Sequence, residues 1–301
     1  MVEARRSTGQ NVDVNRWLLG ARPRTLPAAV VPVALGTAAA VGLPHHVWWR
    51  AGLALVVSLA LQVGVNYAND YSDGVRGTDD VRVGPARLVG GGLAPAKAVK
   101  RAAFVAFGLA AVCGLVLAIV TSWWLLAVGA AAILAGWFYT GGPKPYGYLG
   151  LGEVFVFVFF GLVATAGTTY VVAERLTAVA WLLGAAAGSL ACALLVVNNL
   201  RDIPTDRKVG KRTLAVRLGD RSTRLFYVAL LTAAMVLLVL TAMHGRPGAV
   251  FGLIGIGAAL PAVRVISRGA VGKELIPVLG ATGKVQMITG ILAAIGVALT
   301  A

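Results

Sequence analysis

The stretch ALVVSLALQVGV, residues 54–65, runs directly into NYANDYSDGVRGTDD, residues 66–80. The first part belongs to an apolar run of about 20 residues, which is long enough to span a hydrocarbon core of about 30 Å. The second part carries four aspartates within eleven residues, namely Asp70, Asp73, Asp79 and Asp80. Because carboxylates are costly in a membrane segment, this junction raises the question of what compensates so much negative charge.

The composition of the whole chain is typical of a helical membrane protein. Of its 301 residues, 58% are hydrophobic and 13% are charged, and the mean hydropathy is +0.81. Soluble domains are about 25% charged, and the strands of membrane barrels are about 10 residues long and alternate in polarity. The net charge of +15 is not accompanied by a basic segment interleaved with aromatic residues. We therefore expect a lipid bilayer, and no nucleic acid, as a partner.

Apolar segments predict nine membrane-spanning helices. They cover residues 25–43, 50–71, 98–120, 122–140, 150–173, 177–199, 223–243, 248–266 and 276–300. If the N-terminus is cytoplasmic, the inside connections hold 23 Lys and Arg residues and the outside connections hold 3, as the positive-inside rule requires. We predict an all-α, multi-pass protein of the inner (plasma) membrane, with residues 1–22 as a cytoplasmic N-terminal arm.

Two of the inside connections are long, and each follows a span that ends in Asn and Asp. The first exit reads NYANDYSD from residue 66, and the second reads VVNNLRDIPTD from residue 196. The two exits lie four spans apart. This spacing predicts a single domain, residues 23–301, built from a pseudo-repeat of residues 23–140 and 150–266 with a ninth helix at 276–300.

The polar residues of the two exits have the spacing of a cation site. Asn69 and Asp73 are four residues apart, and Asn198, Asp202 and Asp206 follow one another at the same interval. Residues four apart share a helix face. Oxygen ligands without His or Cys favour Mg²⁺, which commonly binds substrate phosphate as well. We therefore predict that the exits face each other and hold Mg²⁺ and a diphosphate on the cytoplasmic side.

An ordinary alternative exists for part of this acidic set. Asp79 and Asp80 lie on the loop beyond the helix end, where solvated carboxylates commonly pair with neighbouring Arg or Lys residues. For these two aspartates, a metal role and an ion pair are equally good interpretations.

Basic and aromatic residues accompany the exits. Arg and Lys can neutralise a departing diphosphate, although most basic residues in inside connections are explained by topology. A third polar segment, WFYTGGPKPYGYLGLGE at residues 137–153, contains Gly and Pro residues that predict a tight turn. This turn would bring Tyr139 and Lys144 to the same mouth, where a Tyr ring could face a cation. Glu153 is either functional or simply favourable at a helix N-terminus.

These motifs resemble those of the UbiA superfamily of intramembrane aromatic prenyltransferases, and of its menaquinone branch in particular. The resemblance rests on ARPRTLPAAVVPVALG (21–36), NDYSDGVRGTDD (69–80), YTGGPKPYGYLGLGE (139–153) and NNLRDIPTDRKVGKRTLAVRLG (198–219). The general first motif is NDxxDxxxD, and this chain departs from it because Gly77 stands at the last position. The departure leaves open which later aspartate contacts metal.

The resemblance implies a nine-helix bundle around a central cavity that opens sideways to lipid. It also implies Mg²⁺-dependent transfer of a polyprenyl group from polyprenyl diphosphate to an aromatic ring. For the menaquinone branch, the acceptor is 1,4-dihydroxy-2-naphthoate, which loses its carboxyl group to give demethylmenaquinone. Positive charge would stabilise the departing diphosphate, and the apolar cavity would exclude water from the allylic cation.

The residue patterns and the resemblance together give three sets of candidate residues. The candidate catalytic residues are Asp70, Asp73, Asp202, Asp206, Lys211 and Tyr139. The candidate substrate-binding residues are Arg24, Asn66, Arg76, Lys144, Asn198, Asn199, Arg212 and Glu153. The candidate Mg²⁺ ligands are Asn69, Asp73, Asp79, Asp202 and Asp206.

Three other functions would each explain part of the sequence. Another aromatic acceptor, such as 4-hydroxybenzoate, is the alternative within the superfamily. A CDP-alcohol phosphotransferase would explain the DxxDG of Asp70–Gly74, but the rest of its motif is missing. A membrane transporter would explain repeated halves, but its polar site is expected near the bilayer midplane rather than at helix ends.

Overall fold

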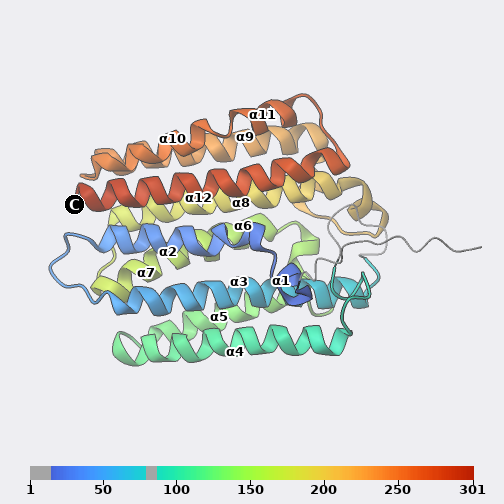
Figure 1. Ribbon diagram of the computed structural model, residues 1–301, viewed down its shortest axis with the longest axis horizontal. Helices are drawn as coiled ribbons and strands as arrows, with labels where there is room; N and C mark the ends of the chain where they lie inside the picture. Colours follow the sequence, from blue (N-terminus) through green and yellow to red (C-terminus); the bar gives the residue numbers. More distant parts are fainter. Residues whose placement is uncertain (1–14, 79–86) are drawn as a thin grey trace, which may run out of the picture.

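The computed structural model describes residues 15–78 and 87–301, and the segments 1–14 and 79–86 lie outside this description. The described residues contain helices and turns and no strand, which confirms the predicted all-α class. The long helices lie side by side along the longest axis of the molecule (Figure 1). The part of the predicted N-terminal arm that is described forms a short helix.

Twelve α-helices are present in the described residues, and four 3₁₀ turns and one π-helical segment connect or interrupt them. The α-helices are α1 (Arg16–Ala21), α2 (Pro27–Ala40), α3 (Trp49–Val75), α4 (Ala96–Val120), α5 (Trp124–Phe138), α6 (Gly152–Val156), α7 (Ala164–Ala173), α8 (Ala178–Lys208), α9 (Leu214–Met243), α10 (Gly252–Gly257), α11 (Leu260–Ser267) and α12 (Leu275–Leu299). The other segments are η1 (Pro23–Thr25), η2 (Tyr146–Leu149), η3 (Phe157–Val163, π-helical), η4 (Pro247–Phe251) and η5 (Gly272–Glu274).

Fewer than nine of the described helices are long and apolar enough to count as candidate spans, so the predicted number of nine remains a prediction. Within residues 15–78 and 87–301, six helices are long and apolar enough to cross a membrane. A seventh span results if the pair Pro247–Gly257 and Leu260–Ser267, bent by 47°, counts as one. The apolar helices α2 and α5 have only 14 and 15 residues. At about 1.5 Å per residue they are about 21–23 Å long, which is short of a hydrocarbon core of about 30 Å.

The shortness of α2 has a local cause. The helix begins at Pro27, whose missing N–H suits a helix start, and it ends at Ala40, just before Gly42 with φ +79°. The predicted span 25–43 is therefore shortened at both ends. The prediction of a cytoplasmic N-terminus remains a prediction, because helix lengths do not orient a bundle.

Packing places the acidic exits at the same end of the bundle. The most extensive helix contacts are those of α3 with α4 and of α8 with α9, which are the corresponding pairs of the predicted pseudo-repeat. The segment η3 lies directly against α8, because a Cβ atom at Gly161 would meet Gly188 Cα at 2.5 Å. Small residues allow membrane helices to approach this closely. The ends of α3 and α8 and the turn before α6 gather at one end (Figure 1).

Candidate active site

A cavity of about 350 Å³ lies between the polar ends of α3 and α8. Both acidic exits line it, with Asn69, Asp70 and Asp73 from α3 and Asn198, Asn199, Asp202 and Asp206 from α8. The remaining candidates that line it are Arg24, Asn66, Tyr139 and Lys211. The predicted spacing explains this arrangement, because residues four apart on each helix project toward the same side.

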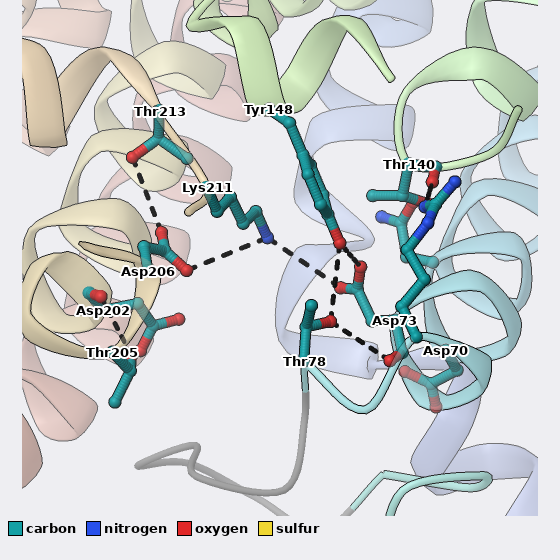
Figure 2. Close-up of polar contacts among 12 residues, drawn as sticks. Asp70, Asp73, Thr78, Thr140, Tyr148, Asp202, Thr205, Asp206, Lys211 and Thr213 are labelled. Atoms are coloured by element: carbon teal, nitrogen blue, oxygen red, sulfur yellow. Dashed lines mark hydrogen bonds and ion pairs between the residues drawn. The ribbon is translucent and has the colours of Figure 1, made fainter. Parts of the chain in front are cut away.

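Lys211 lies between the two exits (Figure 2). Its Nζ atom is 3.9 Å from Asp73 Oδ2 and 4.0 Å from Asp206 Oδ1. It also lies 4.9 Å from the centre of the Tyr148 ring. The two distances from Nζ to carboxylate oxygens are at the outer limit for an ion pair. One cation is thus shared between carboxylates that come from opposite sides of the cavity.

Tyr148 fixes the orientation of Asp73. The Tyr148 hydroxyl donates a hydrogen bond of 2.6 Å to Asp73 Oδ1 (Figure 2). Burial, together with the nearby charge of Asp73, raises the pKa of the Tyr148 phenol, so the phenol stays protonated at neutral pH and acts as a donor. Sequence reasoning missed this residue, although it belongs to the Gly- and Tyr-rich turn.

Asp70 lies in a clamp of two arginines. Arg22 Nη2 donates to Asp70 Oδ1, and Arg87 Nη1 donates to the same oxygen at 2.9 Å. The backbone N–H of Leu88 donates to Asp70 Oδ2 at 3.1 Å, and the Asp70 side chain is only 1% exposed. Arg22 and Arg87 also line the cavity. Sequence reasoning missed both, because nothing in their spacing indicates a partner that is 48 or 17 residues away.

Asp202 and Asp206 differ in how they are held. Arg201 donates from Nε to Asp202 Oδ1 at 2.7 Å and from Nη2 to Oδ2 at 2.6 Å, a two-pronged ion pair. The same Nη2 donates to Asn198 Oδ1 at 2.9 Å. Asp206 Oδ2 accepts a long hydrogen bond of 3.5 Å from Thr213 (Figure 2). Asp202 is thus held by an arginine of its own helix, and Asp206 contacts Thr213 and Lys211 in the segment just before α9.

The asparagines tie neighbouring elements to the exits. Asn69 Oδ1 accepts a hydrogen bond of 2.8 Å from Thr140 at the end of α5. Asn66 Nδ2 donates to Ala21 O at 2.9 Å, and Asn199 Nδ2 donates to Glu153 Oε1 at 2.9 Å. Glu153 is buried behind Asn199 and does not line the cavity. Its contact with the residues that line the cavity is this hydrogen bond to Asn199.

Besides Glu153, four candidates lie away from the cavity or outside the described residues. Arg76 donates to the carbonyls of Thr140 and Gly142, so its guanidinium holds the turn after α5. Arg76 is the C-cap residue of α3. Lys144 and Arg212 are exposed and do not line the cavity. Asp79, together with Asp80, lies in the segment 79–86, which is outside the described residues.

The carboxylates do not form a compact metal cluster by themselves. Within residues 15–78 and 87–301, no group of three His, Cys, Asp or Glu residues is close enough to hold a metal ion. Among the described residues that line the cavity, the side chains able to bind a metal are carboxylates, amides and hydroxyls, which suit Mg²⁺. Asp73 and Asp206 already share one cation across the gap. The donor set therefore fits Mg²⁺ whose coordination is completed by substrate phosphate and water.

A second, apolar cavity of about 190 Å³ adjoins the first. Four residues line both cavities, namely Val65, Tyr139, Val156 and Phe160. An aromatic row follows on this side, because Tyr146 packs against Tyr139 with ring centres 5.5 Å apart and against Phe155 at 3.9 Å. Tyr139 thus lies at the neck where a polar chamber meets an apolar one.

We expect Asp70 and Asp73 to contribute differently to stability. Asp70→Asn leaves Arg22 and Arg87 without their charged partner, and such a loss in a buried pair costs about 3–5 kcal/mol. Asp73→Asn keeps the acceptor of the Tyr148 hydrogen bond and loses only a weak interaction with Lys211. Thermal unfolding of the purified variants in detergent should show a much lower midpoint for Asp70→Asn. Equal midpoints would contradict the assignment of Asp70 to a structural clamp.

Comparisons with known proteins agree with this geometry. The model of the UbiA prenyltransferase family matches residues 29–273. A 1,4-dihydroxy-2-naphthoate octaprenyltransferase of Mycobacterium tuberculosis is 54% identical over 91% of this chain and 93% of that protein. The enzyme of the same name from Escherichia coli is 36% identical over 94% of this chain and 95% of that protein.

Solved structures share the fold. A UbiA homolog from Archaeoglobus fulgidus, solved with GPP and Mg²⁺, superposes with a TM-score of 0.68 at 15% identity and covers 94% of this chain and 99% of that one. A homolog from Aeropyrum pernix gives a TM-score of 0.69 at 15% identity, covering 89% of this chain and 96% of that one. The resemblance seen in the motifs is confirmed, and the chain belongs to the UbiA prenyltransferase family.

Proposed function

We propose that this prenyltransferase transfers a polyprenyl group from polyprenyl diphosphate to 1,4-dihydroxy-2-naphthoate with loss of the acceptor's carboxyl group. The product is demethylmenaquinone. The observation that carries the proposal is the pair of adjoining cavities, one lined by both acidic exits and the other apolar. The relatives that are 54% and 36% identical are named 1,4-dihydroxy-2-naphthoate octaprenyltransferases, which supports the choice of acceptor. We place the reaction at the cytoplasmic side of the plasma membrane.

The two cavities match the two ends of a prenyl diphosphate. Its charged head fits the polar cavity, where Arg22, Arg24, Arg87 and Lys211 supply positive charge. Its hydrocarbon tail fits the apolar cavity, where burial of apolar surface is favourable by about 25 cal/mol per Å². The bond that breaks lies between head and tail, so the reacting carbon lies at the neck.

Asp73 and Asp206 are the best-placed residues to hold Mg²⁺, with Asn69 and Asp202 beside them. Asp73 and Asp206 lie on opposite sides of the polar cavity, with Lys211 Nζ between them at 3.9 and 4.0 Å. When bound, Mg²⁺ would neutralise the charge that develops on the departing diphosphate. Lys211 would then be available to donate to phosphate oxygens. Tyr148 keeps Asp73 in place through its 2.6 Å hydrogen bond.

The neck residues protect the reacting carbon. As the diphosphate departs, the allylic carbon becomes cation-like, and the electron-rich naphthoate ring attacks it. The Tyr139 and Phe160 rings line this point from α5 and η3. Aromatic faces attract cations, and the apolar lining of Val65 and Val156 excludes water that would otherwise capture the cation.

Removing one charge from either exit should abolish most of the transfer. Asp73→Asn and Asp206→Asn each keep the shape of the side chain but weaken the affinity for Mg²⁺ and diphosphate. We expect each to lower kcat/KM at least about 100-fold, measured as prenylated product from purified protein with Mg²⁺.

Asp220→Asn is the matched control for these variants. Asp220 lies on α9 with its side chain 55% exposed and is paired with Arg224 at 2.6 Å, away from the cavity. The control should retain the wild-type rate. Full transfer activity in both Asp73→Asn and Asp206→Asn would contradict the proposed site.

Acceptor identity can be tested on the wild-type protein. With one polyprenyl diphosphate and Mg²⁺, we expect transfer to 1,4-dihydroxy-2-naphthoate and release of its carboxyl carbon as CO₂, measured with a carboxyl-labelled acceptor. Parallel reactions with 4-hydroxybenzoate should yield little product. Transfer to the benzoate alone would assign the chain to another acceptor class within the family.

A further inference from the structure

The apolar cavity is widened by glycines that stand on three different helices. Gly114 of α4, Gly129 of α5 and Gly167 of α7 all line it. A Cβ atom built on any of them would meet no other atom within 4 Å. A larger side chain at these positions would therefore enter the cavity instead of colliding with a neighbouring helix.

Two of these glycines lie at different depths. The neck is marked by Tyr139 on the α5 side and by Phe160 on the α7 side. Gly129 lies ten residues from Tyr139, and Gly167 lies seven residues from Phe160. At about 1.5 Å per helical residue, Gly167 is about 10 Å and Gly129 about 15 Å beyond the neck.

These depths correspond to successive units of a prenyl chain. A four-carbon isoprene repeat made of bonds of about 1.5 Å extends over about 5 Å. The cavity wall on α3 runs from Val65 at the neck to Ala54, which is eleven residues or about 16 Å. The cavity therefore has room for about three extended units beyond the reacting carbon.

We propose that Gly167 and Gly129 determine which prenyl chains the enzyme accepts, by leaving the second and the third isoprene position open. This inference rests on the proposed function, because it takes the prenyl tail to be the occupant of the apolar cavity. A side chain introduced in place of Gly167 shortens the cavity more than a side chain introduced in place of Gly129 does. Neither residue lines the polar cavity that is proposed to hold the diphosphate.

The test compares Gly167→Leu and Gly129→Leu with the wild type on dimethylallyl, geranyl, farnesyl and geranylgeranyl diphosphate, with 1,4-dihydroxy-2-naphthoate as acceptor. For each variant, kcat/KM is divided by the wild-type value for the same donor. We expect this ratio to stay within about twofold of 1 for the shortest usable donors. For longer donors it should fall about tenfold or more, because the tail then overpacks the cavity. The loss should begin one isoprene unit earlier in Gly167→Leu.

Gly108→Leu is the matched control. Gly108 lies on α4, is exposed, has open space around its Cβ position and does not line the cavity, so all four donors should keep their wild-type rates. Gly167→Ala and Gly129→Ala add a single carbon and should show a weaker effect in the same order, in case the leucine variants fold poorly. Thermal unfolding with and without each donor reports binding directly.

The outcomes separate the inference from the proposed function. Equal losses for all donors, or the reverse order of the two variants, would overturn the depth assignment. A dependence of kcat/KM on donor length identical to that of Gly108→Leu would also overturn it. A wild-type protein that prenylates no acceptor would reject the proposed function. In that case, the thermal stabilisation of each variant by each donor would still decide whether cavity depth selects chain length.

Discussion

The constraint on which the structure depends is the compensation of carboxylates at the end of an apolar bundle. Asp70 and Asp202 are neutralised by arginines in short ion pairs. Asp73 and Asp206 instead share the Nζ atom of Lys211 at 3.9 and 4.0 Å. Asp70 thus ties the end of α3 to Arg22 and Arg87, whereas the ion pair of Asp202 with Arg201 lies within α8. Asp73 and Asp206 place carboxylate oxygens from both exits around one cation in the polar cavity.

The polar cavity that holds these carboxylates adjoins an apolar one, and the two together suit the proposed substrate. A prenyl diphosphate has a charged end and an apolar end, and no single environment suits both. The neck of Val65, Tyr139, Val156 and Phe160 separates the two environments. The π-helical segment η3, which carries Phe160, is held by the close approach of Gly161 to α8. Backbone packing of small residues therefore positions the segment that carries Phe160 at the neck.

Much of the site could be predicted from sequence, because it depends on helical periodicity and on position relative to apolar runs. The convergence of the Asn69–Asp73 and Asn198–Asp206 segments follows from these two features. The partners of the charges could not be predicted, because Arg22, Arg87 and Tyr148 reach the site through tertiary packing. The Arg76 guanidinium donates to a carbonyl of the neighbouring turn. The lengths of α2 and α5 depend on where their ends are capped.

A double-mutant cycle on Asp73 and Asp206 tests the central claim that the two exits act together on one bound ion and diphosphate. The measurement is the dissociation constant for inorganic diphosphate in the presence of Mg²⁺, in wild type, Asp73→Asn, Asp206→Asn and the double variant. If both carboxylates bind the same Mg²⁺ and diphosphate, the double variant should bind diphosphate little worse than either single variant, because the effects of coupled residues are not additive. Independent, additive losses of binding free energy would contradict the account.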